Sequence, residues 1–163
     1  MFCIFAVSPL CAAAKHHPEA TVEPALLTDE DGLSIISAAL DLRVSRSARQ
    51  DCSHLVHAIY ERAGFSYPYA RSSDLYNGIE GFQQVDQPQP GDLVVWRGHV
   101  GIVVNPAQHA FFSSMRSRLG VDDYGAPYWK KRGRARFYRY IASNPAQDMT
   151  ATKARFRPTG KEQ

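Results

Sequence analysis

One short segment marks the point at which a polar turn gives way to an amphipathic helix: Arg49-Gln50-Asp51-Cys52-Ser53-His54-Leu55-Val56. Asp51 is a good N-cap residue, so Cys52 is expected at the first position of a helix that ends at Gly64. Unpaired amide groups and the positive end of the helix dipole favour a nucleophilic thiolate there. Cys52 is therefore a candidate for covalent catalysis, although a cysteine on an apolar helix stripe is more often a small buried side chain.

A histidine at the start of an apolar strand supplies the candidate base. The segment from His99 to Val104 reads as a buried strand, and His99, Gly101 and Val103 share one face because side chains alternate. Gly101 is expected to leave room for the helix that begins at Cys52 to lie against His99. A cysteine and a histidine far apart in sequence but adjacent in the fold are typical of a thiol nucleophile with its base, whereas a lone histidine at a strand start is usually structural.

Further helices and short strands surround these two motifs. A helix capped by Thr28 is expected to run to Leu42, with Leu33, Ile36 and Leu40 facing inward. Strands are expected at 82–85, 92–96, 99–104, 109–114 and 134–141, with short helical segments near 73–76 and 128–130. The pattern predicts an α+β domain in which helices pack on an antiparallel β-sheet.

Three segments together resemble the NlpC-type peptidases of bacterial cell walls: Asp51-Cys52-Ser53, Gln89-Pro90-Gly91-Asp92-Leu93-Val94-Val95 and His99-Val100-Gly101-Ile102-Val103-Val104. The resemblance covers about residues 31–141. It implies a papain-like NlpC-type fold with the nucleophile at a helix N-terminus. It also implies that Cys52 is the nucleophile, that His99 is the general base, and that Asp51 and Ser53 line the peptide-binding groove.

The resemblance also implies an orienting residue for the base. The family places a polar residue, most often His, on the strand that follows the strand of the catalytic histidine. Alignment of the aromatic pair in the segment 109–114 puts Ser113 at this position. Ser114 and His109 are the alternatives, because hairpin register decides which residues share the His99 face and a one-residue slip reverses the answer.

The function implied by the resemblance is thiol hydrolysis of an amide in peptidoglycan stem peptides. The bond is either D-glutamyl to diamino acid (endopeptidase) or muramoyl to L-alanine (amidase). Family members usually carry Gly where this chain has His54, and a Tyr and a Gly pair in the loop that corresponds to 43–50. Two alternatives stay open: a cell-wall-binding module with weakened catalysis, and a thiol acyltransferase on the same fold, for which Phe111 and Phe112 hint at an apolar channel.

Three residues of the same helix form a rival constellation. His54, His57 and Glu61 are spaced i, i+3 and i+7 near Cys52, in a pattern that could bind Zn²⁺. The spacing matches no standard zinc motif, and a solvated helix face explains it equally well. We therefore expect no metal and no cofactor.

Composition limits the partners. The chain has 163 residues, enough for one domain with a real core, and its charge of +3 comes from 19 basic and 16 acidic residues. This balance does not indicate a nucleic-acid binder. A strand over 134–141 would place Arg134, Arg136, Tyr138 and Tyr140 on one face, either as a solvated surface or as a contact with an anionic envelope polymer or the membrane surface.

The ends of the sequence suggest an exported protein. Residues 1–14 resemble a truncated signal segment, 15–27 a linker, 28–141 the catalytic domain and 142–163 a mobile tail. No other segment is apolar enough to span a membrane. We expect a secreted, periplasmic or cell-envelope protein that acts on peptidoglycan or its muropeptides, and the sequence does not indicate its oligomeric state.

Overall fold

The computed structural model describes residues 25–44, 51–116 and 118–142. Its strands are β1 (Ala25–Leu26), β2 (Phe82–Val85), β3 (Leu93–Trp96), β4 (His99–Asn105), β5 (Ala110–Ser114), β6 (Leu119–Asp123) and β7 (Arg136–Ala142). Its helices are α1 (Asp29–Val44), α2 (Cys52–Arg62), α3 (Ser72–Asn77), the 3₁₀ helix η1 (Pro106–Gln108) and α4 (Pro127–Lys131). The predicted α+β domain of helices on an antiparallel sheet is confirmed.

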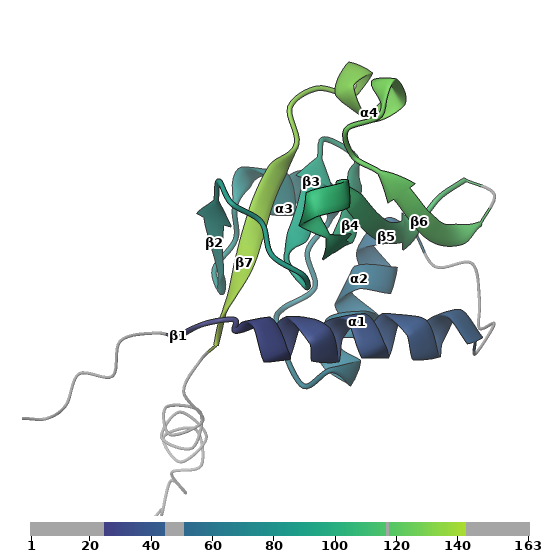
Figure 1. The fold of residues 1–163 in the computed structure, drawn as a ribbon. Helices are drawn as coiled ribbons and strands as arrows, with labels where there is room; N and C mark the ends of the chain where they lie inside the picture. Colours follow the sequence, from purple (N-terminus) through teal and green to yellow (C-terminus); the bar gives the residue numbers. More distant parts are fainter. Residues whose placement is uncertain (1–24, 45–50, 117, 143–163) are drawn as a thin grey trace, which may run out of the picture.

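The strands form one seven-stranded sheet in the order β1-β7-β3-β4-β5-β6, with β2 also paired to β7. Every pairing is antiparallel. Helix α2 packs against β4 and β5, α3 packs against β3 and β4, and α1 packs against α2. Figure 1 shows α1 along the bottom of the molecule and α4 at the opposite end. Helices α2 and α3 thus lie against the sheet, and α1 packs on α2.

All four residues of β3 and the first five of β4 are buried, because both faces of the sheet are covered there. The main core lies between the sheet and the helices, and it includes Leu93, Val95, Val100 and Ile102. A smaller core lies on the other face: Val94, Trp96, Val103, Phe111 and Trp129. The alternation along β3 and β4 therefore assigns each side chain to one of two cores.

The buried face of α1 differs from the predicted one. Leu33 and Leu40 were expected to face inward, but their exposed fractions are 61% and 55%, whereas Ile35 is fully buried. The cause lies at Gly32, which packs against the backbone of Pro90 and Gly91: a Cβ on Gly32 would clash with the Pro90 carbonyl, and one on Gly91 would clash with the Gly32 Cα. This backbone contact sets the rotation of the helix, and the exposed leucines follow from it.

Two short strands were not predicted. β1 falls in the expected linker and has only two residues, too few to show the alternation of apolar and polar side chains that marks a strand. β6 is an edge strand whose sequence, Leu-Gly-Val-Asp-Asp, mixes glycine and acidic residues. The predicted starts of α2 and β4 are confirmed, and Gly98, with φ of 79°, completes the two-residue turn between β3 and β4. Among the described residues, no helix combines the length and the apolar character needed to cross a membrane.

Strand β7 is more buried than a solvated face would be. Tyr138 and Tyr140 both belong to the main core, so the interpretation of this face as solvent-exposed is wrong for them. On the other face, Arg139 donates to the fully buried carboxylate of Asp92, with Nη2 2.9 Å and Nε 3.0 Å from its oxygens. The basic residues of β7 therefore have different partners and do not form one continuous charged surface: Arg139 binds Asp92, and Arg136 binds the carbonyl of Tyr76.

Candidate active site

The thiol of Cys52 lies at the first turn of α2. Asp51 has extended backbone geometry, and its Oδ1 accepts the amide N–H groups of Ser53 and His54 at 2.9 Å each. These hydrogen bonds satisfy two of the unpaired donors of the helix end and fix the start of the helix at Cys52. Cys52 is half-buried against the main core and forms no disulfide. The helix that carries it packs on β4, the strand that begins with His99.

His99 is held by a hydroxyl on the neighbouring strand. The imidazole is only 8% exposed, and its Nε2 lies 3.0 Å from Oγ of Ser113. The same Oγ lies 2.7 Å from the carbonyl oxygen of Val100. A carbonyl can only accept, so the single hydroxyl proton goes to Val100, and Ser113 must accept from Nε2–H of His99. The neutral ring therefore carries its proton on Nε2, and its Nδ1 is left as the basic nitrogen.

The environment of His99 keeps the ring neutral. Burial and the positive charge of Arg132 lower the pKa of His99 to about 4. The ring packs on the indole of Trp129, with centroids 4.7 Å apart, and Trp129 also contacts Trp96 and Phe111. At neutral pH the folded protein therefore holds the imidazole in its neutral form, which is the form in which a general base starts the reaction.

This lowered pKa predicts a loss of stability in mild acid. The unfolded histidine binds a proton below about pH 6.5, whereas folded His99 binds one only near pH 4, so unfolding takes up a proton between these values. As the pH falls from 7 to 4, wild-type protein should lose up to about 3 kcal/mol of unfolding free energy more than His99→Gln. Urea unfolding of both proteins at pH 7, 5.5 and 4 measures this difference. Parallel pH profiles would mean that His99 titrates normally in the folded protein.

The residue after the nucleophile candidate anchors another helix. Ser53 is 5% exposed, and its Oγ accepts the amide N–H of Ser72 at 3.0 Å, which fixes the start of α3 beside the start of α2. Asp51 is exposed, and its Oδ2 lies 2.8 Å from Nδ1 of His54. The amide N–H of His54 is the main cause that lowers the pKa of Asp51. Of the two residues expected to line the groove, Asp51 is exposed at the surface, whereas Ser53 is buried and its hydroxyl is hydrogen-bonded to α3.

The register of the β4–β5 hairpin distinguishes the candidates for the residue that orients His99. Ser113 and Phe111 project to the His99 side of β5, while Phe112, between them, lies in the main core. His109 ends η1 in a left-handed conformation, with φ of 54°, and its ring packs on Tyr124. The structure therefore brings Ser113 to His99 and leaves the side chain of His109 at the exposed turn.

The sequence was compared with models of known protein families. The NlpC/P60 family model matches residues 43–136, which is more than half of the chain. The chain belongs to the NlpC/P60 family. Members of this family are generally cysteine peptidases or hydrolases and are typically associated with the cell envelope. The matched region includes Cys52, His99 and Ser113. No match was found among curated proteins.

One expectation about the NlpC/P60 site needs correction, and the residues of the rival zinc pattern can now be placed. Gly101 was expected to admit the Cys52 helix, but a Cβ there would lie 2.5 Å from the ring of Phe111 on β5. The glycine therefore makes room for the neighbouring strand. Of the three residues of the suggested zinc pattern, His57 and Glu61 lie 3.5 Å apart, but His54 pairs with Asp51 instead. The other ring nitrogen of His57 lies 3.0 Å from the carbonyl oxygen of Tyr67. No group of three or more His, Cys, Asp or Glu among the described residues is placed to hold a metal ion.

Three residues near the site of this NlpC/P60 chain were missed by sequence reasoning. Trp129 and Arg132 shape the surroundings of His99, although both come from a segment 30 or more positions later in the chain. Tyr69 stacks on the ring of His54, with centroids 4.4 Å apart, above the start of α2. His54 thus occupies, with an aromatic partner, the position at which the family usually has glycine. No periodicity or spacing in the sequence links these residues to the site.

Proposed function

We propose that this protein is a papain-like cysteine hydrolase that cleaves an amide bond in peptidoglycan stem peptides. The observation that carries the proposal is the hydrogen bond from Nε2 of His99 to Ser113, which leaves Nδ1 free as a base in a family of cysteine hydrolases. Cys52, at the start of the helix that packs on the same strand, is the nucleophile. Members of the family are typically found at the cell envelope, so we also propose that residues 1–14 act as an export signal.

The proposed reaction follows from these roles. Nδ1 of His99 takes the proton of Cys52 as Sγ attacks the substrate carbonyl. The oxyanion is stabilised by amide N–H groups at the start of α2, where the helix dipole is also favourable. The imidazolium then protonates the leaving amine, and the C–N bond breaks to give a thioester. Water, deprotonated by Nδ1, attacks the thioester and releases the carboxylic acid and the thiol.

The products of the reaction test the proposal directly. Purified protein is incubated with muropeptides of defined structure, and the masses of the products are measured. Release of a peptide that begins with the diamino acid identifies an endopeptidase, whereas release of the intact stem from muramic acid identifies an amidase. If wild-type protein and Cys52→Ala give the same product masses, the protein is not a hydrolase of these bonds.

A second candidate is a cell-wall-binding module with weakened catalysis. The observation in its favour is Ser113 itself, since a neutral hydroxyl stabilises an imidazolium less than a charged or imidazole partner would. The acyltransferase alternative has no comparable support, because Phe111 and Phe112 are both buried in the two cores. Muropeptide binding without turnover would identify the binding module.

Replacement of Ser113 tests its orienting role. Ser113→Ala should lower kcat by about five- to tenfold with little change in KM, because the imidazole loses one hydrogen bond of about 1 kcal/mol. Steady-state kinetics on a stem peptide measures both constants. His109→Asn, which keeps a residue tolerant of the left-handed conformation at the exposed turn, is the control and should have little effect. A severe effect of His109→Asn with a silent Ser113→Ala would reverse the assignment.

A further inference from the structure

We propose that Arg97 and Arg136, gathered over the ring of Tyr76, bind a carboxylate of the peptide substrate at the α3 side of the active site. The inference rests on the proposed hydrolase function and adds a specificity determinant to it. Both guanidinium groups lie over the same ring: the central carbon of Arg136 is 4.2 Å from the Tyr76 centroid, and that of Arg97 is 5.4 Å from it.

The ring and its helix are held firmly in place. Nη1 of Arg136 donates to the backbone carbonyl of Tyr76 at 2.7 Å, and the hydroxyl of Tyr138 donates to the same oxygen at 2.7 Å. The Tyr76 hydroxyl lies 3.4 Å from the carbonyl of Arg134. Arg136 and Tyr76 are half-buried, whereas Arg97 is exposed on the turn between β3 and β4. The pair therefore combines one fixed cation with one that is open to solvent.

The two positive charges have no carboxylate partner among the residues that the structure describes. Within the described parts of the chain, no carboxylate oxygen lies within 4 Å of either guanidinium, in contrast to Arg139, which has Asp92 as a partner. Asp74, on the same helix as Tyr76, accepts the amide N–H of Arg71 at the start of α3. Two cations held near each other repel, and an anion bound between them relieves that repulsion.

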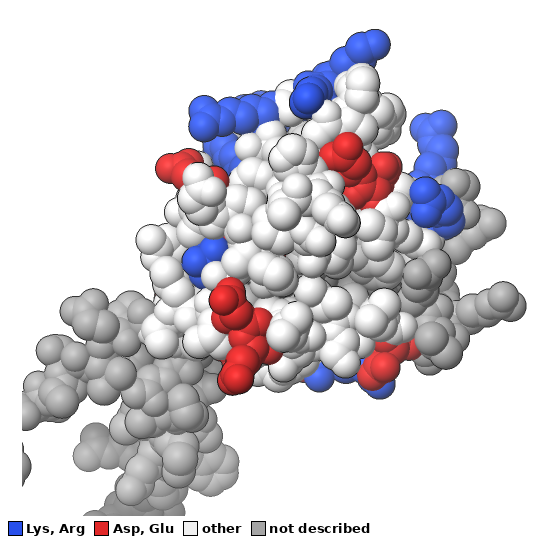
Figure 2. Space-filling model, in the orientation of Figure 1, with Lys and Arg blue, Asp and Glu red and all other residues white. Residues whose placement is uncertain are grey.

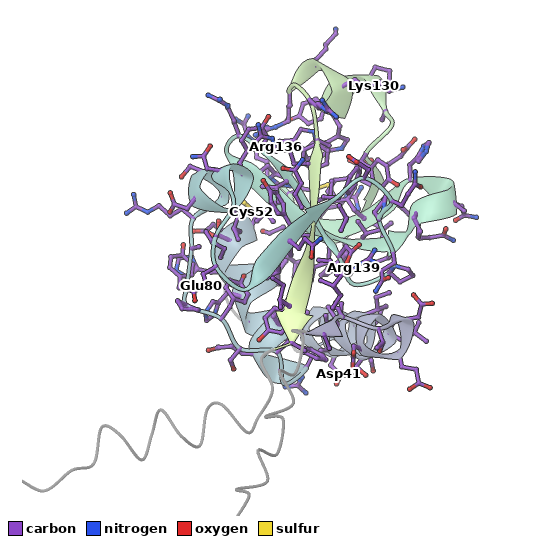
Figure 3. All side chains as sticks on the ribbon, turned by 90° about the vertical axis from the view of Figure 1, so that its left-hand side faces the viewer. Asp41, Cys52, Glu80, Lys130, Arg136 and Arg139 are labelled. Atoms are coloured by element: carbon purple, nitrogen blue, oxygen red, sulfur yellow. The ribbon has the colours of Figure 1, made fainter. Side chains whose placement is uncertain are left out.

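The same pair comes from elements that lie close in the fold or the chain to those carrying the catalytic candidates. Ser53, the neighbour of Cys52, binds the first residue of α3, and at 1.5 Å per residue Tyr76 lies only about 6 Å farther along that helix. Arg97 is separated from His99 by one glycine. Figure 3 labels Cys52 and Arg136 in the same upper part of the molecule, away from Asp41. Figure 2 shows further Lys and Arg side chains at the end where α4 lies.

A carboxylate is the ligand that fits this pair. Guanidinium groups match the two oxygens of a carboxylate with parallel N–H donors, and both groups here lie over the ring of Tyr76. A stem peptide with a γ-linked glutamyl residue carries a free α-carboxylate close to the bond that an endopeptidase cleaves. The Arg97–Arg136 pair would therefore favour this acidic form over the same peptide with an α-carboxamide.

The experiment compares these two peptides. Wild-type protein should cleave the α-carboxylate peptide with a kcat/KM about tenfold or more above that of its α-carboxamide analogue. Arg97→Gln should reduce this preference to about threefold or less, mainly through KM, because the lost contact is made equally in ground and transition states. Lys130→Gln removes an exposed cation from α4 and is the matched control, which should keep the preference. Equal losses on both peptides in Arg97→Gln, or an unchanged preference, would overturn the proposal.

Binding separates failure of this inference from failure of the proposed function. Cys52→Ala, with and without Arg97→Gln, is titrated calorimetrically with both peptides. Preferential binding of the carboxylate form that disappears in Arg97→Gln supports the pair even if wild-type protein cleaves neither peptide, in which case the hydrolase function fails and the carboxylate site stands. Absence of any preference in binding as well as in turnover refutes the carboxylate site.

Discussion

Replacement of Cys52 with alanine is expected to abolish amide hydrolysis, with a fall in kcat/KM of about four orders of magnitude or more. Without Sγ no thioester forms, and the remaining amide groups and His99 cannot supply a nucleophile. The unfolding free energy should change by only about 1 kcal/mol, because Cys52 is small, half-buried and placed at a helix end. Mass analysis of stem-peptide fragments and urea unfolding measure the two effects.

His99→Gln should behave in the same way, since it removes the base while it keeps a planar polar side chain next to Ser113. His54→Ala is the control: it changes a histidine two positions from Cys52 whose ring is directed to Asp51 and Tyr69. This variant should retain most of its turnover. Substantial activity in Cys52→Ala, or a loss in His54→Ala as large as in His99→Gln, would show that the catalytic pair has been assigned incorrectly.

The largest effect on stability is expected from Arg139→Ala. Asp92 is fully buried, and burial raises its pKa even though the hydrogen bonds of Arg139 act in the opposite direction. Removal of the arginine leaves this carboxyl without its charged partner, which should cost about 3–5 kcal/mol of unfolding free energy. Urea unfolding at pH 7 measures the cost.

An exposed ion pair of the same chain provides the control for this prediction. Arg62 and Asp41 lie 3.4 Å apart, but both side chains are more than half exposed. Arg62→Ala should therefore cost less than about 1 kcal/mol. The double variant Asp92→Asn/Arg139→Ala should be less destabilised than the sum of its single changes, because the stranded charge is gone. Equal costs for Arg139→Ala and Arg62→Ala would show that the buried pair contributes no more than a surface pair.

Local chemistry made several features readable from the sequence. Asp51 caps the helix through its own neighbours, so the start of α2 at Cys52 required no knowledge of the rest of the chain. The apolar runs of β3 and β4 and the turn at Gly98 are equally local. The same runs carry the resemblance to the NlpC-type family, which the family match confirms. Each of these signals lies within a few residues of the feature that it predicts.

The tertiary structure alone decided the features that depend on distant segments. The register of β5 on β4 puts Ser113, rather than His109, against His99, and a sequence alternation of period two is compatible with either choice. The buried face of α1 is set by a backbone contact with Gly91, which explains why the apolar pattern of Leu33 and Leu40 was misleading. The local sequence permits several buried faces for a helix and several registers for a strand. Packing against elements far apart in the chain selects one of them, so no single segment of the sequence carries the information that decides the outcome.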